Sequence, residues 1–118
     1  MSPTARSLAL LREMGYQAQV VEYFHGPSRK RRDLFGCIDI VAAHAELGIL
    51  GVQATTGSNH SARFKKACRC PIEAWLAAGA RIQIWSWTKR GKQSERKLWT
   101  VRSQQVTLED LDSGEADG

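Results

Sequence analysis

Apolar positions follow helical spacing in some parts of this chain and strand spacing in others. In residues 4–14 the leucines and a methionine recur at helical spacing, Thr4 can cap the segment and a glycine follows it, so we expect a helix that ends near residue 14. Residues 17–24 read "QAQVVEYF", which is typical of a strand. The stretch 25–33 contains glycine, proline and four consecutive bases, and it predicts a solvated loop.

The two most apolar segments of the chain are 37–45 and 49–56. Both are rich in β-branched residues and are joined by the short link "ELG", so they predict an antiparallel hairpin at the centre of a sheet. Helices are expected at 58–69 and at 71–79, because capping-type residues open the first, and proline opens and glycine closes the second.

The last two strand-like segments, 81–88 and 97–106, predict a second hairpin with a basic tip. Strict alternation in 81–88 places Ile82 and Ile84 on one face of the strand, and Trp85 and Trp87 on the other. The expected order is αβββαβ(β). The fold class is therefore α/β (α+β), with a central mixed β-sheet flanked by helices.

Length and composition favour a single globular domain. The chain has 118 residues, of which 42% are apolar, and no apolar run approaches the roughly 20 residues that cross a bilayer. Three cysteines form neither an even set nor a common zinc spacing. We expect a soluble cytoplasmic protein with reduced thiols, no membrane contact and no organic cofactor.

Charge is unevenly distributed along the chain. Residues 109–118 hold five acids, so residues 1–108 carry 17 basic and seven acidic side chains. We expect one domain over 1–108 and an acidic, flexible tail over 109–118. Three basic clusters, at 29–32, 63–69 and 89–97, are typical of a protein that binds the phosphate backbone of nucleic acid. The alternative is a basic surface that serves solubility alone.

Two polar residues interrupt the apolar central hairpin. Asp39 lies inside "CIDIV" and Gln53 lies late in "ILGVQATT". If the hairpin turns near Glu46, both residues are seven positions from the turn and face each other across the strands. A carboxylate buried in a strand needs a charged partner or a metal ion, and oxygen ligands suit Mg²⁺.

This arrangement resembles the PD-(D/E)XK nuclease superfamily, whose fold is a restriction-endonuclease-like core. The strings "RDLFGCIDIVA" and "ILGVQATTGSNHSAR" are similar to the "DLFG.ID" and "Q.T.GSN..AR" wording of small Holliday junction resolvase-like and phage-borne members. The resemblance implies a nuclease-like domain over 1–108 that hydrolyses DNA, including branched or structured DNA such as Holliday junctions, with Mg²⁺ or Mn²⁺. It also implies a homodimer.

The resemblance also implies the residues of the site. The metal would be held by Asp39, Gln53, Asp33 and the backbone carbonyl of Ala54. Thr55 stands where the superfamily has lysine, and Lys66 on the following helix is the natural substitute, whereas Lys65 points elsewhere. The catalytic set is then Asp39, Gln53, Lys66 and Asp33. The helix-one glutamate of many resolvases has no counterpart, and Glu22 is the only nearby acid on a structured element.

The expected nucleic-acid contacts come from the basic loop and from the helix after the central hairpin. They are Arg29, Lys30, Arg31, Arg32, Ser58, Asn59, Arg63 and Lys65. His60 is a minor candidate for substrate contact, and Trp85, Trp87 and Trp99 fit the core or a dimer surface better than base stacking.

Several structural alternatives stay open. Asp33 could cap a turn or form an ion pair with Arg31 or Arg32. Gln53 could be a core residue whose amide makes hydrogen bonds within the protein. For the whole protein, a catalytically impaired nuclease-fold module that only binds nucleic acid is the alternative function, because Thr55 supplies no positive charge.

Overall fold

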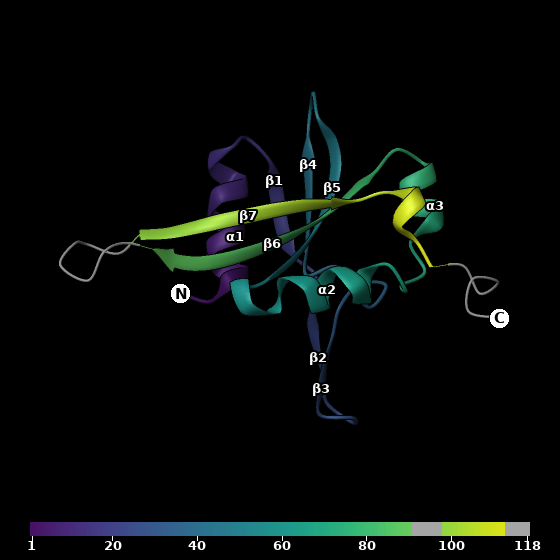
Figure 1. Cartoon of the computed structure of the whole chain (residues 1–118), viewed down its shortest axis with the longest axis horizontal. Helices are drawn as coiled ribbons and strands as arrows, with labels where there is room; N and C mark the ends of the chain where they lie inside the picture. Colours follow the sequence, from purple (N-terminus) through teal and green to yellow (C-terminus); the bar gives the residue numbers. More distant parts are fainter. Residues whose placement is uncertain (91–97, 113–118) are drawn as a thin grey trace.

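A five-stranded mixed sheet runs through the computed structural model, which describes residues 1–90 and 98–112 (Figure 1). The strand order is β1-β4-β5-β6-β7, and β5 and β6 are parallel while the other neighbours are antiparallel. The strands are β1 (Gln17–Val20), β4 (Ile40–His44), β5 (Gly48–Thr56), β6 (Arg81–Arg90) and β7 (Leu98–Val106).

Helices cover both faces of this sheet. The helices are α1 (Pro3–Glu13), α2 (His60–Ala67) and α3 (Glu73–Ala77). Leu11 of α1 packs with Leu50 and Val52 on one face, whereas Ala67 of α2 packs with Ile82 and other residues on the opposite face. The predicted α+β class, with a mixed sheet flanked by helices, is confirmed. No helix among the described residues is both long and apolar enough to cross a membrane.

The alternation predicted for β6 is confirmed. Ile82 and Ile84 belong to the core cluster beside α2 and α3, and Trp85 belongs to the cluster beside α1. Trp87 lies on the α1 side as well, since its indole N–H donates to Ser7 Oγ at 2.8 Å. This strand is buried on both faces because helices cover both sides of it.

The central hairpin forms in the register expected from its turn. Ile40 pairs with Val52, and the Asp39 amide donates to the Val52 carbonyl at 2.9 Å, which puts Asp39 opposite Gln53. A Cβ at Gly51 would lie 2.9 Å from the Ile38 side chain, so a larger residue there would displace Ile38.

Two predictions for the N-terminal part are wrong. The cap of α1 is Ser2, whose Oγ accepts from the Ala5 amide at 3.1 Å, because Pro3 suits the first helical position and moves the start of the helix before Thr4. The strand expected at 17–24 breaks after Val20, since the amides of Val21 and Glu22 both turn to the Asp39 carbonyl.

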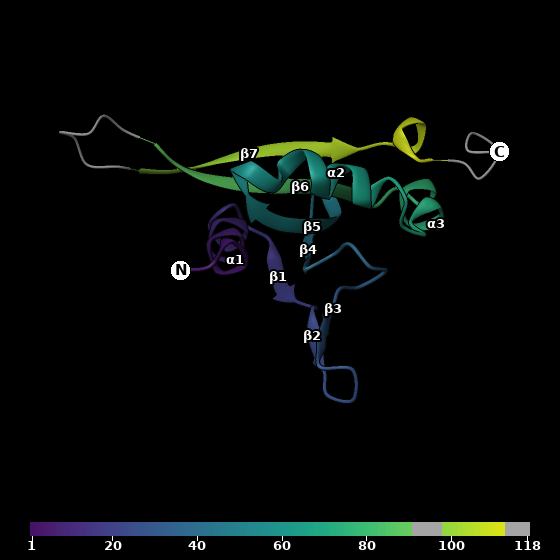
Figure 2. The same ribbon diagram turned by 60° about the horizontal axis from the view of Figure 1, so that its bottom comes forward.

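The predicted basic loop is a hairpin. Strands β2 (Tyr23–His25) and β3 (Lys30–Arg32) pair antiparallel, and Figure 2 shows them projecting away from the large sheet. Arg29 lies in the turn with φ of 54°, a left-handed conformation that closes the hairpin. Gly26 and Pro27 lie in a turn as expected, but the bases that follow Arg29 form a strand rather than a loop.

Helical ends in the C-terminal half also differ from expectation. The helix predicted from 58 begins with a 3-10 turn, η1 (Gly57–Asn59), and α2 follows it. The prediction of a flexible tail from residue 109 is wrong for residues 109–112. There η2 (Leu108–Asp110) is closed by a capping box with Thr107, and the Asp112 amide donates to the Cys68 carbonyl. Residues 113–118 and the predicted basic tip at 91–97 lie outside the described residues.

Candidate metal centre

Three carboxylates meet at the base of the small hairpin. Glu22, Asp33 and Asp39 each place an oxygen within 4.8 Å of the others. The cause is strand register: Tyr23 pairs with Arg32, so Glu22 and Asp33 flank the first pair of the hairpin and oppose each other. The Glu22 and Val21 amides bind the Asp39 carbonyl, and this attaches the hairpin base to the central strands.

Asp39 is the buried member of this group, only 3% exposed. Its Oδ2 accepts hydrogen bonds from Gln53 Nε2 at 2.8 Å and from the Ala54 amide at 2.9 Å. The pKa of Asp39 is raised from 3.8 to about 7, first because burial disfavours the charged form and next because it shares a hydrogen bond with Asp33. The Ala54 N–H lowers the pKa, and the charges of Asp33 and Glu22 raise it again.

Gln53 contributes an unsatisfied acceptor to the same place. It is 2% exposed, and its Oε1 is buried without a hydrogen-bond partner in the described part of the chain. Leaving a buried acceptor unpaired costs on the order of 1–3 kcal/mol. Rotation of the amide would instead turn Oε1 toward Asp39, which is unfavourable beside a charged carboxylate unless a cation lies between them.

Basic side chains border these acids. A depression of about 250 Å³ is lined by Glu22, Asp33, Asp39, Gln53 and Ala54 together with Thr4, Arg63 and Lys66. Lys66 Nζ lies 3.8 Å from Asp33 Oδ2, a loose ion pair. Asp33 therefore faces Lys66 of α2.

The expected contacts on η1 and α2 divide among different surfaces. Arg63 and Lys66 line the depression, and exposed Lys65 does not. Asn59 was expected on the helix with them, on the face one and two turns before Arg63 and Lys66, but it lies in η1 and donates to Thr56 Oγ1 at 3.1 Å. Ser58 lines another depression, beside β6 and β7. A 3-10 turn has a different pitch from an α-helix, so the helical spacing counted from Asn59 does not apply.

Two further residues of the motif region lie in the core. His60 is 2% exposed, and its ring nitrogens are 2.6 Å from Ser86 Oγ and 2.8 Å from Gln104 Oε1. This position is incompatible with the substrate contact expected for it. Thr55 is 5% exposed and lies on the same face of β5 as Gln53. For Ala54, the contact seen with Asp39 is through its amide rather than its carbonyl.

The basic hairpin adjoins this centre. Arg29, Lys30 and Arg32 are exposed, as are Tyr23 and Phe24 of β2. Because β2 starts next to Glu22 and β3 ends next to Asp33, cationic side chains and the carboxylate cluster occupy adjoining parts of the surface.

Sequence reasoning did not include Glu22 in the site. Its position in the sequence could have identified it. Glu22 lies as many residues before the turn that contains Pro27 as Asp33 lies after that turn. Two residues at equal distances from a hairpin turn face each other across its strands.

The donor set fits a small divalent cation. The cluster offers three carboxylates and the amide oxygen of Gln53, which are ligands that Mg²⁺ and Mn²⁺ prefer. Burial disfavours the charged form of one of these carboxylates, Asp39, and a bound cation would stabilise that form. A cation would relieve the mutual repulsion of the carboxylates, and with the Gln53 amide rotated it would also take Oε1 as a ligand. The residues present are therefore compatible with the metal that the sequence predicts.

Comparisons with protein-family models, with curated proteins and with solved structures found no match to this chain.

The raised pKa of Asp39 predicts an unusual dependence of stability on pH. Between about pH 4 and 7 the folded protein keeps a proton on Asp39 that the unfolded chain has released, so the free energy of unfolding falls as pH rises through this range. In metal-free buffer, the melting temperature of Asp39→Asn should decline less between pH 4 and 7 than that of the parent. Parallel declines measured by circular dichroism would show that Asp39 ionises normally.

Proposed function

We propose that this protein is a metal-dependent endonuclease that hydrolyses phosphodiester bonds in DNA. The observation that carries the proposal is the convergence of Glu22, Asp33 and Asp39 within 4.8 Å beside the unpaired Gln53 Oε1. Lys66 and Arg63 line the same depression, and the basic hairpin adjoins it. Acidic ligands within a basic surface are what cleavage of a polyanion requires, since the cation needs oxygen ligands and the substrate needs positive charge.

The order of elements supports the resemblance to the PD-(D/E)XK superfamily. Apart from the β2–β3 hairpin and the short helix α3 before β6, the chain runs through α1, β1, β4, β5, α2 and β6, with β6 parallel to β5. We infer that these elements form a restriction-endonuclease-like core. The proposed site residues Asp39 and Gln53 lie on its central hairpin, where the superfamily carries its acidic motif.

In the proposed reaction the acidic side chains would bind the metal ion, and the basic side chains would contact the phosphate. Asp39, Asp33, Glu22 and the Gln53 amide oxygen would hold Mg²⁺ or Mn²⁺. When bound, such an ion lowers the pKa of a coordinated water and offsets the negative charge that develops on the phosphate. Lys66 would add positive charge to the same phosphate, as the superfamily lysine does in related sites, and Arg63 would hold a phosphate oxygen.

The test is incubation of purified protein with Mg²⁺ or Mn²⁺ and labelled DNA. The panel compares linear duplex, single strand, flap and four-way junction, each with EDTA as the metal-free control. Metal-dependent products from at least one substrate, absent for Asp39→Asn, would support the proposal. If none of the four is cut under conditions where the protein binds them, hydrolysis is not its function. Light scattering of the free and DNA-bound protein tests the homodimer that the resemblance implies.

A second candidate is a module that binds nucleic acid without cutting it. Thr55 favours this alternative, because it is buried where the superfamily has lysine and a hydroxyl group supplies no charge. The two functions differ in one measurement: the binding module retains salt-dependent affinity for DNA and yields no products with any metal.

The basic hairpin should carry part of the affinity in either case. Replacing Arg29, Lys30, Arg31 and Arg32 together by alanine removes four charges, and each lost phosphate contact lowers the slope of log affinity against log salt by about 0.9. We expect the slope measured by fluorescence anisotropy to fall by about three to four units. Arg69→Ala is the control, because Arg69 pairs with Asp112 away from the hairpin. Equal slopes for the hairpin variant and the parent would exclude this surface.

A further inference from the structure

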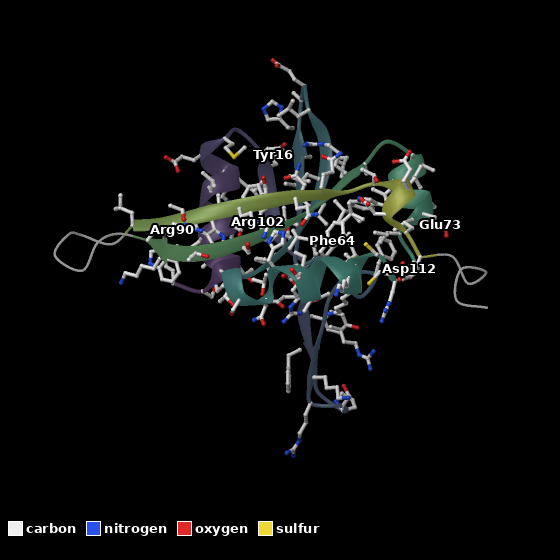
Figure 3. The ribbon with its side chains drawn as sticks, in the orientation of Figure 1. Tyr16, Phe64, Glu73, Arg90, Arg102 and Asp112 are labelled. Atoms are coloured by element: carbon white, nitrogen blue, oxygen red, sulfur yellow. The ribbon has the colours of Figure 1, made fainter. Side chains whose placement is uncertain are left out.

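A second basic surface lies on the β6–β7 hairpin, apart from the carboxylate cluster. A depression of about 570 Å³ is lined by Lys89, Arg90, Trp99 and Arg102 together with Ser58 of η1. All four hairpin side chains are exposed, and Trp99 retains 40% of its surface. Figure 3 shows Arg90 and Arg102 along this hairpin, with Arg90 at its far end. We call Lys89, Arg90, Trp99 and Arg102, with Arg6 of α1, the β6–β7 basic surface.

The cations of this surface have no acidic partner among the residues that line the depression. Elsewhere in the described ranges, Lys66 pairs with Asp33 and Arg69 pairs with Asp112. Like charges along a depression whose lining residues include no acid repel one another, and that repulsion disfavours the arrangement in isolation. An anionic ligand would remove it.

Trp99 holds one of these cations in place. The Arg6 guanidinium lies 4.0 Å from the centre of the Trp99 ring, and Lys89 Nζ lies 6.0 Å from it. A guanidinium that stacks on an aromatic ring keeps its N–H donors at the edge, where they can bind phosphate oxygens. Trp99 therefore supports Arg6, and with 40% of its surface exposed it does not lie in the core.

Two helix starts connect this surface to the carboxylate cluster. In α1, Thr4 lines the depression at the cluster, and Arg6, on another side of the same first turns, stacks on Trp99. Beyond η1, Arg63 lines the depression at the cluster, whereas Ser58 lines the one on β6 and β7. Figures 1 and 2 show the starts of α1 and α2 close to the same stretch of β6. A polyanion long enough to pass the start of α1 or the η1 turn can therefore reach both depressions.

We propose that the β6–β7 basic surface binds the phosphate backbone of the DNA segment that flanks the phosphate at the carboxylate cluster. This inference rests on the proposed function for the identity of the ligand. A phosphate backbone is favoured because its charges repeat at regular intervals. Along this depression they can meet Lys89, which lies on the α1 side of the hairpin with Arg6, and Arg102, which lies on the α2 side. The proposal gives the β6–β7 hairpin a role in positioning the substrate, in addition to the role of the acidic residues at the carboxylate cluster.

The experiment measures DNA binding in EDTA, so that it does not depend on cleavage. Arg102→Gln and Arg69→Gln each remove one charge, from this surface and from the Arg69–Asp112 pair respectively, and form a matched pair. We expect Arg102→Gln to lower the salt slope by about 0.9 and Arg69→Gln to leave it unchanged. The triple variant Arg6→Gln, Lys89→Gln, Arg102→Gln should lower the slope by about two to three units. Circular dichroism verifies that the triple variant is folded.

A double-mutant cycle tests the role of Trp99. If its ring supports Arg6, Trp99→Leu weakens binding in the parent and has little further effect when Arg6 is already glutamine. Independent effects of the two substitutions would contradict that role.

The outcomes separate this inference from the proposed nuclease function. If the parent cuts DNA while the triple variant keeps parental affinity and slope, the surface is not used and the inference falls alone. If no substrate is cut but the triple variant loses affinity as expected, the inference stands and the nuclease proposal falls. Binding of phosphatidylserine vesicles through the same residues, with DNA affinity unaltered, would overturn it in favour of a membrane surface.

Discussion

Lys66→Ala is expected to slow single-turnover cleavage at saturating DNA by about a hundredfold or more. Lys66 Nζ lies 3.8 Å from Asp33 Oδ2 and borders the depression that holds Asp39 and Gln53, so its charge acts where the phosphate gains negative charge. Affinity should stay within a few fold of the parent, because one phosphate contact among many is lost. Rapid-quench kinetics measures the rate, and anisotropy measures the affinity.

Lys65→Ala is the matched control for Lys66. It removes the same charge from the same helix, but Lys65 is exposed outside the depression, so the cleavage rate should not change. If Lys66→Ala cuts at the parental rate, the catalytic cation comes from elsewhere, and Arg63 is the next residue to replace.

Thr55→Lys provides the reverse experiment. Thr55 is buried on the same face of β5 as Gln53, so a lysine there would extend along that face toward the carboxylates. We expect it to restore cleavage at least partly in Lys66→Ala, or to start cleavage if the parent is inactive. No change in either background would contradict the assignment of Lys66 as a migrated superfamily lysine.

Asp39→Asn is expected to abolish binding of Mn²⁺ and Mg²⁺ in calorimetry and, with it, all cleavage. Asparagine keeps the shape of the side chain and an oxygen that can accept from Gln53 Nε2 and the Ala54 amide, as Asp39 Oδ2 does now. It removes the negative charge that a cation needs. The variant should therefore fold, and its loss of metal binding reflects the site itself.

Glu46→Gln is the matched control for Asp39→Asn. Glu46 is an exposed acid in the turn between β4 and β5, outside the cluster formed by Glu22, Asp33 and Asp39. Its replacement should leave metal affinity unchanged. Metal binding by Asp39→Asn equal to that of the parent would mean that the cation lies at another place in the protein.

Local patterns in the sequence determined the central hairpin. Strand residues alternate between faces with a period of two, and a short turn leaves little choice of register. These two rules are enough to place Asp39 opposite Gln53, and the Ile40–Val52 pair agrees with them. The same period explains the two faces of β6. The ends of α1 and α3 followed from glycines that adopt positive φ, Gly15 and Gly79.

The resemblance had already named Asp33, Gln53 and Lys66 as neighbours of Asp39, but only tertiary structure decided how these groups meet and added Glu22 to them. The strand expected at 17–24 ends early because the amides of Val21 and Glu22 bind the Asp39 carbonyl, a contact between segments distant in the chain. That break lets 23–32 fold into its own hairpin and brings Glu22 opposite Asp33. Lys66 reaches the same place only because α2 packs over β5 and β6. Periodicity is a property of neighbouring residues, whereas these contacts depend on how separate segments compete for the same backbone hydrogen bonds, and only the folded chain resolves that competition.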